Sequence, residues 1–175
     1  MHRLSTTIED FRRSAGLLPT GVCVITAAAE HDLRGMTANA ITTVSLHPLL
    51  LLCCLRRGGA MHNLVHDAGA LAVNVLAADQ EHLARHFATP DRPPGEAQFT
   101  PAAWRPGPET SAPLLLGAVT AFECTVRDIT AAGDHSIFIC EVAALHRGRA
   151  TNPLLFVGGA YRRLDVEPAI VQPAA

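Results

Sequence analysis

The stretch RGMTANAITTVSLHPLL, residues 34–50, leads into an apolar core segment yet carries many small polar side chains, and the reason for them is the central question of this sequence. It opens with a turn-forming glycine, Gly35, and passes almost without charge into a run of pure hydrocarbon. Its first half carries small hydroxyl and amide side chains and one large apolar residue, Met36. A strand that only packs against a core prefers bulky branched residues. Small side chains here instead favour a strand that lets a flat ligand lie close to its backbone.

The sequence on either side of this stretch is rich in expected strands. They are predicted at 21–27, 49–55 and 71–77, then as a hairpin of about 117–129 and 135–146, and finally as the pair LLFV and AYRRL around Gly158-Gly159. Gly133 in the TAAGD turn of the hairpin suits a positive φ. With about six to eight strands and no regular βαβ alternation, we expect a mostly antiparallel β-barrel with helices attached.

Three helices are expected outside the sheet. Thr6 and Glu9 form a predicted capping box for the first, in which Ile8, Phe11, Ala15 and Leu18 recur at helical spacing until Pro19. Residues 30–35 are then predicted to form a polar turn. A short helix is predicted at 61–68, and Asp79 is expected to cap another that runs through Phe87.

Residues 89–113 contain seven prolines in a mostly polar stretch. Such a stretch predicts a long surface excursion. We expect Phe99 and Trp104 to pin it to the body of the protein.

Composition favours one domain over residues 1–175, since 49% of the residues are hydrophobic and 17% are charged. A net charge of -2 without a basic block argues against nucleic-acid binding. No apolar run is long enough to span a bilayer, and the first residues lack the apolar core of a signal peptide. We therefore expect a soluble cytoplasmic protein. The five cysteines include no CxxC, which indicates buried free thiols: Cys23, Cys53, Cys54, Cys124 and Cys140.

Several kinds of chemistry are excluded or disfavoured. All 14 basic residues are arginine, which rules out a P-loop lysine and a Schiff-base lysine. The sequence contains no GxGxxG, GxSxG or HExxH. Asp134, His135 and Ser136 are neighbours in a strand, so they alternate between faces and form no relay by themselves. The pairs His62/His66 and His82/His86 are one helical turn apart but lack a third ligand, which favours solvated helix faces over a metal site.

The run Arg56-Arg57-Gly58-Gly59 lies between a buried strand and a helix. A glycine-rich strand-to-helix turn exposes backbone N–H groups, and a helix N-terminus favours an anion. Two guanidinium groups add phosphate-binding donors. The run by itself fits a solvated turn equally well, but the small residues at 35–45 favour a phosphate-bearing ligand with a flat ring.

Five motifs in order resemble the short-chain flavin reductases, the reductase components of two-component flavin-dependent monooxygenases. They are FRRSAGLLPTGVCVIT, RGMTANAITTVSLHPLLLLCCLRR, LAVNVLAADQEHLARHFA, GDHSIFICEV and PLLFVGGAYRRL. The resemblance extends from about Phe11 to Leu164 and leaves residues 165–175 as a C-terminal tail.

This resemblance implies a flavin-binding split β-barrel that forms a homodimer. It implies NAD(P)H:flavin oxidoreductase activity, with reduced FMN or FAD passed from NADH or NADPH to a separate monooxygenase. By motif, the resemblance implies that the edge of the isoalloxazine lies against Gly35, Met36, Thr37, Ala38 and Asn39, and that Ser45 lies near the flavin. It implies that the flavin phosphate faces Arg56, Arg57, Gly58 and Gly59. His135 and Tyr161 fall on the nicotinamide side, where His135 is the expected catalytic residue, by positioning the hydride donor.

The sequence departs from the family at two places. His47 precedes Pro48 where relatives often carry an acid, and Gly58-Gly59-Ala60 stands where they usually have a serine. Two other functions stay open: a flavoprotein of the same fold that retains its flavin for other redox chemistry, and a non-catalytic flavin-binding or scaffold protein. The presence of both His135 and Tyr161 favours catalysis over the latter.

Overall fold

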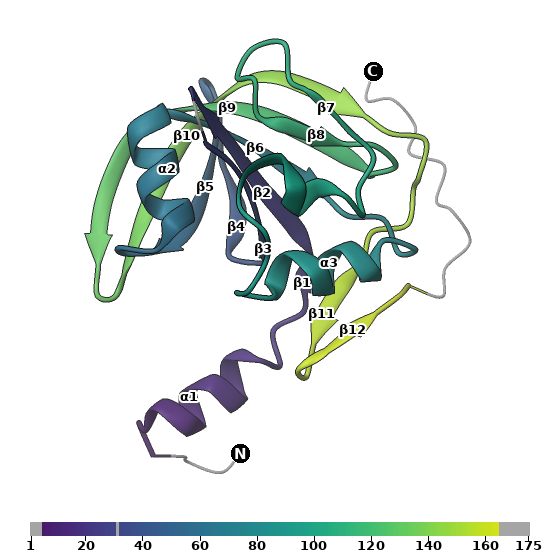
Figure 1. Cartoon of the computed structure of the whole chain (residues 1–175). Coiled ribbons are helices and arrows are strands. Elements are labelled where there is room, and N and C mark those ends of the chain that lie inside the picture. Colours follow the sequence, from purple (N-terminus) through teal and green to yellow (C-terminus); the bar gives the residue numbers. More distant parts are fainter. Residues whose placement is uncertain (1–4, 31, 165–175) are drawn as a thin grey trace.

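The computed structural model describes residues 5–30 and 32–164. They form one strongly curved antiparallel sheet with two smaller sheets at its ends; the second and third helices pack against the sheet, whereas the first helix projects away from it (Figure 1). The helices are α1 (Ile8–Ala15), α2 (Ala60–Ala68) and α3 (Glu81–Ala88), with a 3-10 turn η1 (Gly95–Phe99). The strands are β1 (Thr20–Gly21), β2 (Cys23–Ala29), β3 (Asp32–Ala38), β4 (Ile41–Leu46), β5 (Leu49–Arg56), β6 (Ala70–Val75), β7 (Trp104–Pro106), β8 (Pro113–Leu115), β9 (Thr120–Ala132), β10 (His135–Arg147), β11 (Leu155–Val157) and β12 (Ala160–Arg162).

The main sheet has the strand order β3-β2-β6-β9-β10-β5-β4. Its two edge strands, β3 and β4, follow one another in the chain and are separated only by Asn39 and Ala40. Such a short link brings the two edges of the curled sheet together at one end, and the Cys54 N–H, which donates to the Ala40 carbonyl at 3.1 Å, continues the pairing of β4 with β5 there. Within the described residues no ladder joins β3 to β4. The predicted mostly antiparallel, split-barrel-like architecture is confirmed, and residues 34–50 cross its seam.

Alternating side chains fill the inside of the curved sheet. This core is made of residues from five strands and α2: Cys23, Ile25, Ala27, Leu51, Cys53, Leu55, Met61, Leu64, Val65, Leu71, Val73, Cys124, Phe138 and Cys140. A second cluster lies between the sheet, α3 and the 89–113 excursion, and it buries Phe87 and Phe99 with Trp104 packed against them. The expected pinning by Phe99 and Trp104 is confirmed.

The five cysteines are unpaired, and four of them are buried as expected; Cys54 is half-buried. Burial raises the pKa of Cys23 and of Cys124 to about 12, so the reactive thiolate is scarce at neutral pH.

Three local predictions are wrong in detail. The N-cap of α1 is Thr7, not Thr6, and its Oγ1 accepts from the Asp10 N–H at 3.1 Å. Asp79 does not cap α3; Gln80 precedes that helix, and its Oε1 accepts from the Ala77 N–H at 3.0 Å. The polar turn is shorter than 30–35, because Ala29 already pairs with Asp32. The predicted C-terminal tail, 165–175, lies outside the described residues.

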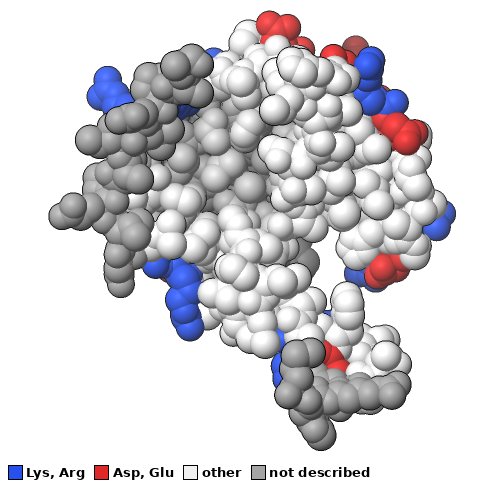
Figure 2. All heavy atoms as spheres, turned by 180° about the vertical axis from the view of Figure 1, so that it is seen from behind, with Lys and Arg blue, Asp and Glu red and all other residues white. Residues whose placement is uncertain are grey.

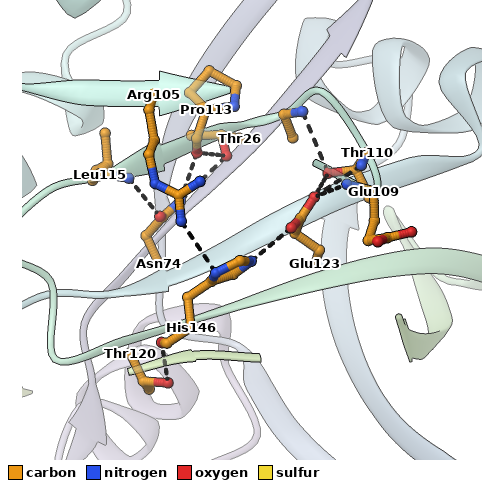
Figure 3. Close-up of polar contacts among 11 residues, drawn as sticks. Thr26, Asn74, Arg105, Glu109, Thr110, Pro113, Leu115, Thr120, Glu123 and His146 are labelled. Atoms are coloured by element: carbon orange, nitrogen blue, oxygen red, sulfur yellow. Dashed lines mark hydrogen bonds and ion pairs between the residues drawn. The ribbon is translucent and has the colours of Figure 1, made fainter. Parts of the chain in front are cut away.

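Strand β9 carries a buried carboxylate, Glu123 (Figure 3). Glu123 Oε2 accepts from the N–H groups of Glu109 and Thr110 at 3.0 and 2.8 Å, and from Thr110 Oγ1 at 2.8 Å. Its Oε1 lies 2.6 Å from His146 Nε2. Burial acts to raise the pKa of Glu123, but the bonds from His146, Thr110 and Glu109 outweigh it, so the pKa lies below its ordinary value. The excursion is thereby fastened onto the sheet.

Candidate functional site

The side chains of β3 alternate between the barrel core and α3. Met36 and Ala38 pack against the core, whereas Gly35 and Thr37 face the helix. A Cβ at position 35 would lie 2.5 Å from the Phe87 ring, so only glycine lets β3 and α3 approach this closely. Thr37 Oγ1 donates to the Ala84 carbonyl at 2.7 Å. Part of the small-residue pattern therefore serves helix packing.

The backbone of β3 is covered at Gly35 and approachable further along. The Gly35 N–H donates to Gln98 Oε1 at 2.8 Å, and its carbonyl accepts from Arg92 Nη2 at 2.8 Å. Both partners belong to the 89–113 excursion. Asn39, just after the strand, is exposed and donates through Nδ2 to Thr20 Oγ1 at 3.1 Å. A ligand at this strand would meet its far end, near Asn39.

A small apolar pocket of about 130 Å³ lies at that end. It is lined by Val22, Thr37, Ala38, Asn39, Phe156 and Tyr161. The structure thus brings together three residues assigned to the ring edge and the tyrosine assigned to the nicotinamide side. Ser45 is not among the residues that line this pocket; its Oγ accepts from the His47 N–H at 3.1 Å within the turn that ends β4.

The Arg56–Gly59 turn and His135 are direct neighbours. Arg56 and His135 are paired across β5 and β10, and the Arg57 N–H donates to the Asp134 carbonyl at 3.0 Å. Both arginines are exposed, and Gly58 has a positive φ of 71°. The turn leads into α2, whose N-cap residue, Gly59, makes no side-chain capping bond. First-turn N–H groups of a helix have no intrahelical acceptor, so this end can receive an anion.

His135 lies at the tip of the β9–β10 hairpin with 44% of its side chain exposed. Its Nδ1 is 2.9 Å from Asp134 Oδ1, and this hydrogen bond lowers the pKa of Asp134. A cleft of about 870 Å³ separates the hairpin tip from α1. Its lining is Ser5, Thr6, Thr7, Ile8, Asp10, Phe11, Arg12, Ser14, Asp134 and His135. The volume falls in the range of cofactor-sized sites. The hairpin tip, α1 and the β11–β12 hairpin lie toward the same end of the molecule (Figure 1).

Two histidines predicted to be solvated are half-buried. His62 Nε2 lies 3.0 Å from Ser136 Oγ and ties α2 to β10, and His86 Nε2 lies 2.7 Å from the Gln98 carbonyl oxygen. Among the residues the structure describes, no group of three potential metal ligands is found.

Two charged residues at or near the site were not predicted from the sequence. Arg85 places its guanidinium 5.0 Å from the centroid of the Tyr161 ring. Glu81, one turn earlier in α3, holds that guanidinium in an ion pair at 2.7 Å. The Glu81–Arg85 spacing is a visible i, i+4 signal, but no local pattern places Tyr161 beside it.

Much of the described surface is uncharged. Seen from behind, arginines and acidic residues lie mostly at the periphery of a broad face without charge (Figure 2). The exposed large apolar side chains include Ile8 and Phe11 of α1, at 74% and 72% exposure, and Val44, Leu46 and Leu49 of β4 and β5. No helix in the described ranges is both long and apolar enough to cross a membrane.

Comparison with known proteins shows the family to which the chain belongs. The model of the flavin reductase like domain matches residues 15–165. An NADH-dependent FAD reductase of Streptomyces globisporus is 45% identical over 152 residues, which cover 87% of this chain and 83% of that protein. The FMN reductase (NADH) RutF of Bradyrhizobium diazoefficiens is 34% identical over 166 residues, covering 94% and 91%.

Solved structures of flavin reductases are also similar to this chain. The NADH:FAD oxidoreductase SgcE6 of Streptomyces globisporus C-1027 superposes with a TM-score of 0.88 at 41% identity, covering 95% of this chain and 99% of that one. BorF, the flavin reductase component of a bacterial two-component tryptophan halogenase, has a TM-score of 0.86 at 37% identity, covering 92% and 100%. The chain belongs to the flavin reductase-like family, and the resemblance of its five motifs is confirmed.

Proposed function

We propose that the protein is an NADH-dependent flavin reductase that supplies reduced FMN or FAD to a separate oxygenase. The observation that carries the proposal is the juxtaposition of His135 with the Arg56–Gly59 turn beside a cofactor-sized cleft. The relatives named above are NADH-dependent reductases of FAD or FMN, and SgcE6 has also been solved with NAD and FAD fragments. BorF serves a halogenase, so a flavin-dependent halogenase or monooxygenase is the partner class that this protein would supply.

The residues of the chain fit a flavin and a nicotinamide. A bound flavin supplies the hydride acceptor, and the reduced nicotinamide supplies the donor. Arg56, Arg57 and the N-terminus of α2 offer charge and N–H donors for a phosphate. Thr37, Ala38 and Asn39 offer a smooth surface for a ring. His135 can hold the donor ring near the acceptor, since hydride transfer requires near-contact distance.

Steady-state oxidation of NADH, followed as free FMN or FAD is added, tests this proposal. Rapid consumption that depends on diffusible flavin is expected, with NADPH as the comparison donor. A protein that stays yellow through gel filtration and does not respond to added flavin would support the flavin-retaining alternative. Flavin binding without any NADH oxidation would support the non-catalytic alternative.

Replacing both arginines of the turn should weaken FMN binding. In Arg56→Ala/Arg57→Ala, loss of charge-assisted phosphate contacts should cost about 1.5–3 kcal/mol, or roughly 10- to 150-fold in Kd. Riboflavin has no phosphate and should bind the variant as well as it binds the wild type. Fluorescence titration with both flavins measures this, and an equal loss for riboflavin and FMN would contradict a phosphate role.

A homodimer forms part of the proposal. The apolar face of α1 and the outer side of β4 and β5 are uncovered in the described chain, and exposed Ile8, Phe11, Leu46 and Leu49 together favour burial against a second copy. Light scattering at micromolar concentration should give twice the chain mass. The matched variant Phe11→Asp should shift the protein toward monomer, and a wild type that is already monomeric would remove the dimer from the proposal. The unpaired cysteines suit a reducing compartment, so we include a cytoplasmic location.

A further inference from the structure

We propose that Arg85 is a positioning residue for Tyr161 and thereby sets the affinity for the nicotinamide donor. The inference rests on the proposed function, because it takes Tyr161 to lie on the nicotinamide side. It adds a residue to which the resemblance gives no role in the site, on a helix that otherwise packs against β3.

Tyr161 lies on a strand that is weakly supported. β12 has three residues and, among residues 5–30 and 32–164, pairs only with β11, in a three-stranded sheet completed by the two-residue strand β1. Strands this short are marginal by themselves. Neighbouring side chains must therefore fix the ring. Phe156 meets it edge to face with centroids 5.4 Å apart and 64° between planes, and Arg85 lies over it at 5.0 Å.

Arg85 is itself held in place. Its Nε and Nη2 both donate to Glu81 Oε1, at 2.9 and 2.7 Å, which fixes the plane of the guanidinium. The helix that carries both residues is fastened to β3 next to Arg85, where the Ala84 carbonyl accepts from Thr37. Burial of Phe87 against Gly35 adds a second attachment. The guanidinium is thus positioned relative to β3, and Tyr161 is positioned relative to the guanidinium.

This arrangement links the two walls of the small pocket. Thr37 and Ala38 of β3 form one wall, and Phe156 and Tyr161 form the other. At about 130 Å³ the pocket is below the range of complete ligand sites, so it suits one ring or the end of a larger molecule. The path from Thr37 through α3 and Arg85 to Tyr161 fixes the distance between the walls. We infer that losing Arg85 loosens the Tyr161 wall without disturbing the Arg56–Gly59 turn.

The test compares Arg85→Ala, Arg85→Lys and Arg13→Ala. Arg13 makes the same i, i+4 ion pair, with Glu9 at 3.0 Å, but lies over no aromatic ring of the described part of the chain, so it is the matched control. In Arg85→Ala the KM for NADH should rise roughly two- to fivefold, the range of an exposed cation–π contact, while kcat and the Kd for FMN stay unchanged. The NADH KM of Arg85→Lys should lie between those of the wild type and Arg85→Ala, since lysine keeps the charge but lacks the planar guanidinium.

A second measurement does not depend on turnover. Tyr161 is the only tyrosine of the chain, so tyrosine labelled with ¹³C at the ring ε carbons gives one aromatic C–H signal by NMR when the ring flips rapidly. That signal should move when NAD⁺ is added to the wild type. It should be displaced in free Arg85→Ala, and the NAD⁺ titration of that variant should show a weaker Kd. Adding Arg85→Ala to Tyr161→Leu should change the NADH KM little further, because Arg85 acts through the tyrosine ring.

The outcomes separate this inference from the function itself. A wild type that fails to oxidise NADH with any flavin would overturn the proposed function. An active wild type whose Arg85→Ala form keeps its NADH KM and its tyrosine signal would overturn the role of Arg85 alone. Parallel losses in kcat, flavin binding and thermal stability would also overturn it, because they would show a general structural role.

Discussion

Replacing Glu123 by glutamine should destabilise the protein by about 3 kcal/mol, although the two side chains have the same shape. The reason lies in the bonds that the carboxylate accepts. The guanidinium of Arg105 can only donate, and its Nη2 lies 3.2 Å from His146 Nδ1, so that nitrogen accepts and His146 Nε2–H donates to Glu123. A glutamine amide would leave either His146 or the Thr110 donors facing an N–H group in a buried site.

Urea unfolding of Glu123→Gln measures this loss. Glu109→Gln is the matched control, because its side chain is exposed and only its backbone N–H reaches Glu123. In an Arg105→Ala background the Glu123→Gln substitution should cost less, since His146 Nδ1 can then carry the proton and Nε2 can accept from the amide. Equal stability of wild type and Glu123→Gln would contradict the ionised network.

The same carboxylate predicts a direction of pH dependence. Its pKa is lower in the folded chain than in the unfolded chain, so it stabilises the fold above the unfolded value of about 4.3 and loses that contribution as pH falls toward the folded value. The stability difference between wild type and Glu123→Gln should therefore be largest near neutral pH and shrink below about pH 4.

The second large effect is expected at the hairpin tip. His135→Ala should lower kcat/KM for NADH by about 1–3 kcal/mol, roughly 5- to 150-fold, because the donor ring loses a group that holds it near the flavin. Flavin Kd should change little. The loss should appear as a slower flavin reduction together with a higher KM, since positioning acts on both.

Stopped-flow bleaching of the flavin across a range of NADH concentrations measures the His135 effect directly. His66→Ala is the control, since that imidazole is also exposed and also contacts a neighbouring aspartate, at 3.1 Å. Reduction rates equal to those of the wild type at every NADH concentration would contradict the positioning role and show that His135 is an ordinary exposed residue of a surface turn.

Local signals predicted most of the fold. Hydrophobic runs placed β2, β5 and β6 within a few residues, and Gly133 correctly marked the hairpin turn, where its φ is 64°. The class and the order of elements followed from these signals. Resemblance of motifs, rather than physical patterning, supplied the ligand assignments, and the structure brings several of those residues together.

Contacts between distant segments could not be predicted in this way. Glu123 alternates with apolar neighbours as an outward-facing residue should, and only the folded 104–115 segment turns that face into an interior. Gly35 was taken as a turn residue, whereas its lack of a Cβ serves the approach of Phe87. Arg85 and Tyr161 meet because α3 and β12 converge in space, and no spacing within either segment indicates it.

The two-residue link of Asn39 and Ala40 limits how far the two edges of the sheet can separate. Three Cα–Cα steps of about 3.8 Å separate Ala38 from Ile41, so the edges can part by no more than about 11 Å at that end. The width of the seam is therefore a property of chain length and not of side-chain choice. The seam therefore limits the thickness of a ligand that enters there and does not depend on groups attached to that ligand further away. Differences in the tail of a cofactor would have to be sensed elsewhere, at the arginine turn after β5.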